Sequence, residues 1–237
     1  FLDFAPGEVA APREYVIGPR AALVRRLLAD QLDFISVAKR FNRIREFSAV
    51  LDHIIPTDGN QGRLGGKSAG LILAEAILLT ASRKGVYELR HKVPTSYFLP
   101  SIGILEFIEY NGLEELINVK YKTREEVREE YPLVERLFKN GSMPPTIHDG
   151  LEKMLLEIGE RPLVVRSSSL LEDRIGHAFS GKYKSLFLAN QGGRQERLEA
   201  LVLATVRRTV RLQERGVGLR LDVDEVGYRD GVADFRE

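Results

Sequence analysis

The chain has 237 residues, of which 43% are hydrophobic and 29% charged, which suffices for one large or two small globular domains. Its formal net charge of +1 excludes a global electrostatic attraction to nucleic acid or anionic membranes, and its apolar runs are too short to span a bilayer, so neither is an expected partner. The lack of cysteine excludes disulfides and thiolate metal sites and suits a cytoplasmic location, which we expect.

The first 55 residues predict a leader followed by helices. Residues 1–19 contain three prolines and two glycines without sustained periodicity, which is typical of irregular structure. From Ala21 to Leu51 apolar residues recur three to five positions apart, which predicts one helix or two helices joined near Asp30. We assign residues 1–55 to this N-terminal leader and helical segment.

A glycine-rich stretch follows at residues 56–70, before an apolar run at 71–82 that predicts a helix. Glycines let a backbone approach a ligand closely, and the amides at a helix start favour an anion, which Lys67 could also reach. A Walker A loop needs four residues between its glycines, whereas Gly62 and Gly66 are separated by three. A phosphate loop and a simple glycine turn that caps the helix therefore both remain open.

The middle of the chain predicts a strand and then several helices. The strand is expected at 93–100 between prolines, and the helices at 101–117, 123–139 and 146–158. Thr123 and Glu126 have capping-box spacing, Pro132 should interrupt its helix, and Gly159 should end the last one. The order of helix, strand, helices and strand indicates an α/β or α+β fold.

Residues 162–188 combine a short strand with a cluster of anion-binding groups. A buried strand at 163–165 should present Arg166 at its carboxyl end, followed by the hydroxyls of 167–169. Ser180, Gly181 and Lys182 come next, in a loop that we expect to be mobile. These groups predict a polyphosphate site.

The end of the chain changes character. Residues 196–211 predict a helix, but residues 209–237 lack long apolar runs and predict no packed structure. We therefore expect an irregular tail at 206–237.

Three blocks together resemble a known family. LGGKSAGL at 64–71, VPTSYFLP at 93–100 and VVRSSSLLEDRIGHAFSGKYKSL at 164–186 have the order and approximate spacing of the nucleotide-binding domain of phosphoenolpyruvate synthase and pyruvate phosphate dikinase. The resemblance covers residues 56–205 and implies an ATP-grasp-like fold that binds ATP and Mg²⁺. In that family ATP phosphorylates a histidine on a separate swivelling domain, which carries the group to pyruvate.

The resemblance also implies roles for individual residues. Lys67 matches the phosphate-binding lysine, and Arg166 matches the catalytic arginine that neutralises the nucleotide phosphates, so we expect their side chains to converge. The remaining expected nucleotide-binding residues are Gly65, Gly66, Ser167, Ser168 and the loop of Ser180, Gly181 and Lys182, which would close over the phosphates. Ser167 and Ser168 would orient Arg166 or donate hydrogen bonds. Glu172 and Asp173 belong to the motif, but a role in binding magnesium and a role in bracing the loop both remain open.

The resemblance stops short of a whole enzyme. The family's second nucleotide-binding half, its histidine domain and its pyruvate-binding barrel have no counterpart in the sequence, so we expect an incomplete ATP-binding domain that is inactive alone and needs other domains to reach pyruvate or another acceptor. Two alternatives stay open. One is a P-loop-type nucleotide hydrolase, which the glycine spacing disfavours, and the other is a non-catalytic ligand-sensing module of the same fold.

Overall fold

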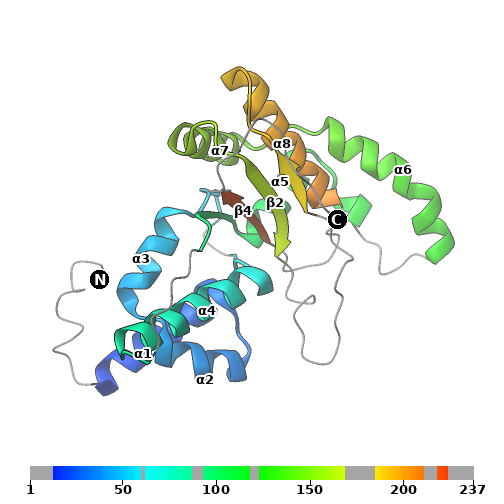
Figure 1. The fold of residues 1–237 in the computed structure, drawn as a ribbon. Coiled ribbons are helices and arrows are strands. Elements are labelled where there is room, and N and C mark those ends of the chain that lie inside the picture. The colour runs from blue at the N-terminus through cyan, green and yellow to red at the C-terminus, as the bar shows by residue number, and fades with distance from the viewer. Residues whose placement is uncertain are drawn as a thin grey trace.

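The computed structural model describes residues 13–59, 62–86, 93–117, 123–168, 185–210 and 218–223. Helices surround a small antiparallel sheet (Figure 1), a mixed architecture that is consistent with the expected α/β class. The helices are α1 (Arg13–Leu23), the π-helical turn η3 (Val24–Leu28), α2 (Leu32–Phe41), α3 (Ile44–Asp52), α4 (Gly66–Arg83), α5 (Ser101–Tyr110), the 3-10 turn η4 (Glu114–Ile117), α6 (Arg124–Asn140), α7 (Pro145–Ile158) and α8 (Arg194–Val210). The strands are β1 (Ser96–Leu99), β2 (Leu163–Ser168), β3 (Leu186–Leu188) and β4 (Gly218–Val223).

The sheet has the strand order β1-β4-β2-β3. β4 pairs antiparallel with both β1 and β2, placing Arg220 opposite Phe98 on one side and Arg166 on the other. The expectation of an irregular tail at 206–237 is therefore wrong for 218–223, which form an inner strand of the sheet. α8 also continues past residue 206, to Val210.

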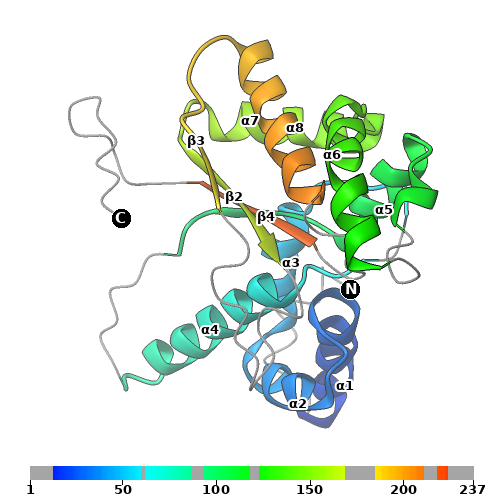
Figure 2. The same ribbon diagram turned by 90° about the vertical axis from the view of Figure 1, so that its right-hand side faces the viewer.

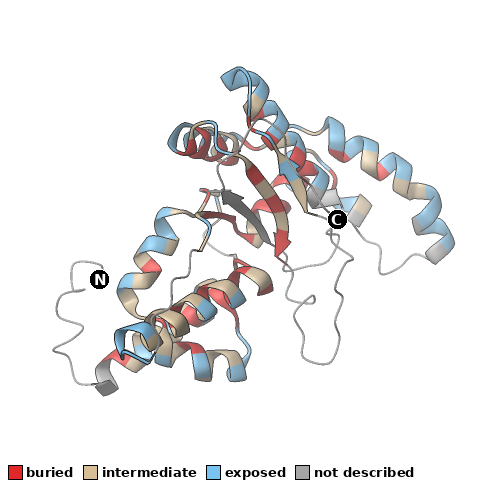
Figure 3. Cartoon of the chain, in the orientation of Figure 1, coloured by how far each residue is buried: buried red, intermediate tan, exposed pale blue. Residues whose placement is uncertain are grey.

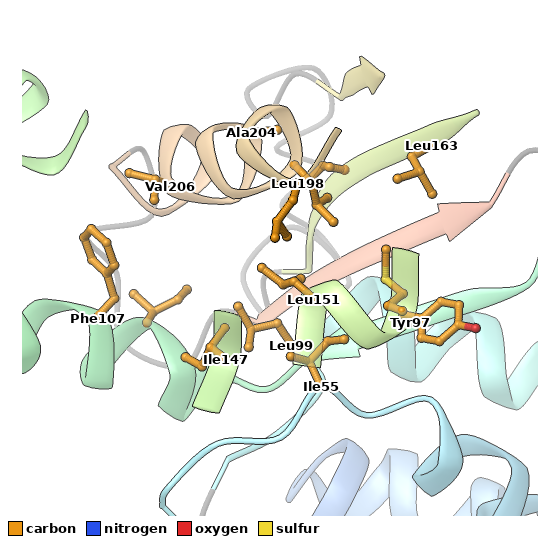
Figure 4. Packing of buried hydrophobic residues seen from close by; sticks show 14 of the residues in the cluster. Ile55, Tyr97, Leu99, Phe107, Ile147, Leu151, Leu163, Leu198, Ala204 and Val206 are labelled. Carbon is orange, nitrogen blue, oxygen red and sulfur yellow. The ribbon is translucent and has the colours of Figure 1, made fainter. Parts of the chain in front are cut away.

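The sheet separates two hydrophobic cores. α7 and α8 lie on one side of it and α4 on the other (Figure 2). The main core joins α5, α6, α7 and α8 to one face of β1 and β2, and Figure 4 shows Leu151 and Leu198 in it with Leu163. The second core joins η3, α2, α3 and α4 to Phe98 on the opposite face.

Alternation along the strands produces this division. Tyr97 and Leu99 belong to the main core, whereas Phe98, between them, belongs to the second core. Successive side chains of a strand point to opposite faces, so β1 contributes to both cores. Buried residues accordingly occur on both sides of the sheet in Figure 3.

The N-terminal helices differ from the expected boundaries. α1 begins at Arg13, inside the expected leader, and contains Pro19. The break at 29–31 agrees with a junction near Asp30, and a second break falls at 42–43. The expectation of irregular structure is therefore wrong for residues 13–19, where burial of Val16 and Val24 offsets the local cost of Pro19, and residues 1–12 lie outside the described residues.

The later helices follow their patterns more closely. The capping box of α6 is present, with the Thr123 amide donating to Glu126 Oε2 at 2.7 Å and the Glu126 amide donating to Thr123 Oγ1 at 3.3 Å. α7 ends as expected before Gly159, whose φ is 65°. The predicted interruption of α6 at Pro132 is wrong, and so is a continuous helix over 101–117, because α5 ends at Tyr110 and η4 follows separately.

Within the described ranges, no helix combines the length and the apolar character that crossing a bilayer requires.

Candidate functional site

The site begins where α4 abuts the end of β2. α4 starts at Gly66 rather than at residue 71, so the second half of the glycine-rich stretch is helical. Gly65, the N-cap, has φ 83°, and a Cβ built on it would lie 1.8 Å from the carbonyl oxygen of Ser168. Only glycine fits both the left-handed backbone and this close approach, so Gly65 sets the position of the helix start against the strand.

Ser168 caps α4 from another element. Its Oγ accepts a hydrogen bond from the Ser68 amide at 3.0 Å and another from Ser68 Oγ at 2.9 Å. Ser68 is the third residue of α4, and its amide is one that an N-cap side chain normally satisfies. Because Gly65 has no side chain, Ser168 performs this role across 100 positions of sequence, and both serines are fully buried.

The loop before α4 is held by the N-terminal helices. The Leu64 amide donates to the carbonyl of Leu27 in η3 at 2.9 Å, and Leu64 is 1% exposed in the second core. Arg63 forms an ion pair with Asp30 at 3.0 Å. Its amide donates to Ser101 Oγ at 3.2 Å, and its carbonyl accepts from the Ser101 amide at 3.0 Å. The backbone that leads to Lys67 is therefore anchored on two sides.

Arg166 lies inside β2 rather than after it. The strand runs to Ser168, because pairing with β4 continues through Ser168 and Gly218, so the expectation of a strand ending at 165 is wrong. Strand alternation places Arg166 on the same face as Ser168, which is the face that contacts α4. Arg166 and Lys67 are both partly buried, and the Nε atom of Arg166 is fully so.

Ser167 points away from this face. It alternates with Arg166 and Ser168, shares its face with Val165 of the main core, and is 1% exposed. Its hydroxyl makes no hydrogen bond to the residues that the structure describes. The geometry thus separates two serines to which the sequence assigned one role.

The structure therefore brings together part of the expected site. Gly65, Gly66 and Lys67 form the start of α4, and Ser168 and Arg166 lie on the facing side of β2. The convergence of the Lys67 and Arg166 side chains stays a prediction. Ser180, Gly181 and Lys182, together with the expected mobile loop, lie outside the described residues.

Sequence reasoning missed two supports of this arrangement. The role of Ser168 as a cap has only an indirect signal, namely a helix that starts with two glycines and so has no cap of its own. The contact between Leu64 and Leu27 has no local signal, because it joins two backbone groups.

The donor set suits an anion. The amides of a helix start carry partial positive charge, Lys67 adds a cation in the first turn of α4, and Arg166 belongs to the strand that caps this helix. Among the described residues, no group of three or more histidine, aspartate or glutamate side chains could hold a metal ion.

A comparison with protein families gives a match over most of the chain. The family model described as the AMP/ATP-binding domain of pyruvate phosphate dikinase matches residues 61–211. The matched range contains the start of α4 and the whole of β2, and it ends before β4. A search of curated proteins finds no match.

Proposed function

The chain belongs to the family of the pyruvate phosphate dikinase AMP/ATP-binding domain, and on that premise we propose that the start of α4 and the facing end of β2 bind the phosphates of ATP. The observation that carries this proposal is the cap of α4 by Ser168. It holds the helix start, and Lys67 with it, beside the strand that carries Arg166.

Each residue has a physical role in the proposal. Gly65 lets the helix start lie close to β2, and Lys67 and Arg166 neutralise phosphate oxygens from α4 and β2. Ser168 already engages the amide of Ser68, so we assign the phosphates to the preceding amides of Gly66 and Lys67. Ser168 is then a positioning residue, and Ser167, on the other face, takes no part.

The proposed reaction is that of a dikinase-like phosphotransferase with an ATP-grasp-like fold. ATP would phosphorylate a carrier histidine that another domain supplies, and pyruvate or another acceptor would receive the group. Charge on Lys67 and Arg166 would stabilise the phosphoryl group during transfer, since such chemistry depends on positioning and electrostatics. Membership of the dikinase family supports this function over a P-loop hydrolase, whose glycine spacing the loop lacks.

Titration calorimetry with ATP tests the binding proposal. Arg166→Ala and Lys67→Ala should each weaken ATP binding about tenfold or more, because a hydrogen bond to a charged group contributes about 1.5 to 3 kcal/mol. The control is Arg136→Ala, which removes an exposed arginine of α6. Equal ATP affinity in the Arg166 and Arg136 variants would refute the assigned site.

A further inference from the structure

A cavity lies between α3, α4 and the segment that leads into β1. Its volume is about 340 Å³, and its polar wall comprises Asn42, Glu46, His53, Glu75, Thr95 and Ser96. Asn42, Glu46 and His53 precede residue 61, where the family match begins, so part of this wall lies outside the matched range. We propose that it binds a small organic cation, a primary amine on an apolar body.

The wall contains a buried hydrogen-bond acceptor that the described residues do not satisfy. Asn42 is 1% exposed, and its buried Oδ1 accepts no hydrogen bond from the residues that the structure describes. Such an atom costs free energy unless a ligand or water donates to it. His53 Nδ1 donates to the carbonyl of Ala49 at 2.9 Å, so this nitrogen is already engaged.

The charges of the wall also favour a cation. Glu46 accepts from the Arg43 amide at 2.8 Å and pairs with Arg83 at 3.1 Å, so its carboxylate is already engaged. Glu75 forms no ion pair with any described residue. No lysine or arginine lines the cavity among the described residues, and an unneutralised carboxylate repels phosphates and carboxylates.

The remaining residues of the wall indicate that the rest of the ligand is apolar. Leu71, Ile72 and Leu79 of α4, Val50 of α3 and Phe98 of β1 present apolar surface. The volume of the cavity is near the lower end of the range for small-molecule pockets, so it can hold a single ring or a short branched chain. An ammonium on such a body would donate to Asn42 and Glu75 while its apolar part contacts α4.

Calorimetry on the full chain with three probes tests the proposal: phenethylamine, the neutral 2-phenylethanol and the anionic 3-phenylpropanoate. We expect saturable binding of the amine, with the alcohol about tenfold weaker or more and the acid weaker still, because only the amine makes a charge-assisted contact. Glu75→Gln should lower amine affinity about tenfold, and Asn42→Ala should lower it as well. Glu129→Gln, on the exposed face of α6, should leave it unchanged.

Three results would overturn the proposal. The first is equal affinity for the amine and the alcohol, and the second is unchanged amine affinity in Glu75→Gln. The third is binding of adenosine that is lost in Asn42→Ala, because that result would identify the cavity as a pocket for the nucleotide base. If Asn42→Ala fails to fold, the amine affinity of Glu75→Gln tests the proposal. This variant should fold, because Glu75 is partly exposed and glutamine has the same shape.

Discussion

Gly65 occupies a position where a single methyl group should disrupt the candidate site. Its φ of 83° and the 1.8 Å between a built Cβ and the Ser168 carbonyl oxygen both disfavour any other residue. We expect Gly65→Ala to lower the free energy of unfolding by about 3 kcal/mol or more, because backbone strain and a backbone clash add together. Urea unfolding followed by circular dichroism measures the change.

Gly70 provides the matched control on the same helix. It is exposed, and a Cβ built on it meets no atom within 4 Å. Gly70→Ala should raise the free energy of unfolding by about 0.5 to 1 kcal/mol, since alanine loses less backbone freedom in a helix. Similar effects of the two substitutions would mean that Gly65 does not abut β2 as described.

Tyr97 gives the protein a predictable response to alkaline pH. Burial, and next a hydrogen bond from its hydroxyl to the Glu157 carboxylate, raise the pKa of Tyr97 to about 12. Because this folded-state pKa lies above the unfolded value of 10, the stabilisation is fully present below about pH 10 and is lost as pH rises toward 12. A pKa shift of this size corresponds to a free-energy difference of about 2.7 kcal/mol.

Comparison with Tyr97→Phe isolates this effect. The difference in free energy of unfolding between the wild type and Tyr97→Phe should be constant from pH 8 to about pH 10 and should change by about 2 kcal/mol as pH approaches 12. Urea unfolding at several pH values measures it. A difference independent of pH throughout would contradict the raised pKa.

At the scale of elements, α6 tolerates a proline in its interior. Val134 and Phe138, which follow Pro132 by two and six residues, are buried in the main core, and this burial holds the helix together across Pro132. Pro132→Ala should restore a helical hydrogen bond and raise the free energy of unfolding by about 1 to 3 kcal/mol. Thermal and urea unfolding measure the gain.

Pro145 is the control for this substitution. It occupies the first turn of α7, where proline costs no hydrogen bond and its fixed φ suits the helix. Pro145→Ala should therefore give no gain in stability. A gain from Pro145→Ala as large as that from Pro132→Ala would show that the effect does not arise from the helix interior.

At the scale of the whole molecule, β4 joins the strands that carry the site and the core. It supplies partners for four residues of β1 and six of β2. A variant that ends at residue 210 would leave these inner backbone groups unpaired, and we expect it to lose cooperative unfolding. A variant that ends at residue 223 keeps β4 and serves as the control, and a cooperative transition in both would contradict the role of β4.

Local patterns in the sequence predicted much of this protein. Apolar periodicity located α4, α7 and α8, a capping box located the start of α6, and the blocks around Lys67 and Arg166 indicated the family that the matching model confirms. These features depend on residues a few positions apart, so the sequence determines them without knowledge of the fold.

Tertiary structure alone decided the features that join distant residues. The cap on α4 depends on Ser168, and the anchoring of Leu64 depends on a carbonyl in η3. The position of Arg166 inside β2, on the strand face that contacts α4, depends on the pairing of β2 with β4. β4 itself has weak local signals, because an inner strand is stabilised by pairing with its neighbours more than by its own propensity. The sequence by itself therefore determined which residues could bind phosphate, whereas long-range packing decided which of them share one face.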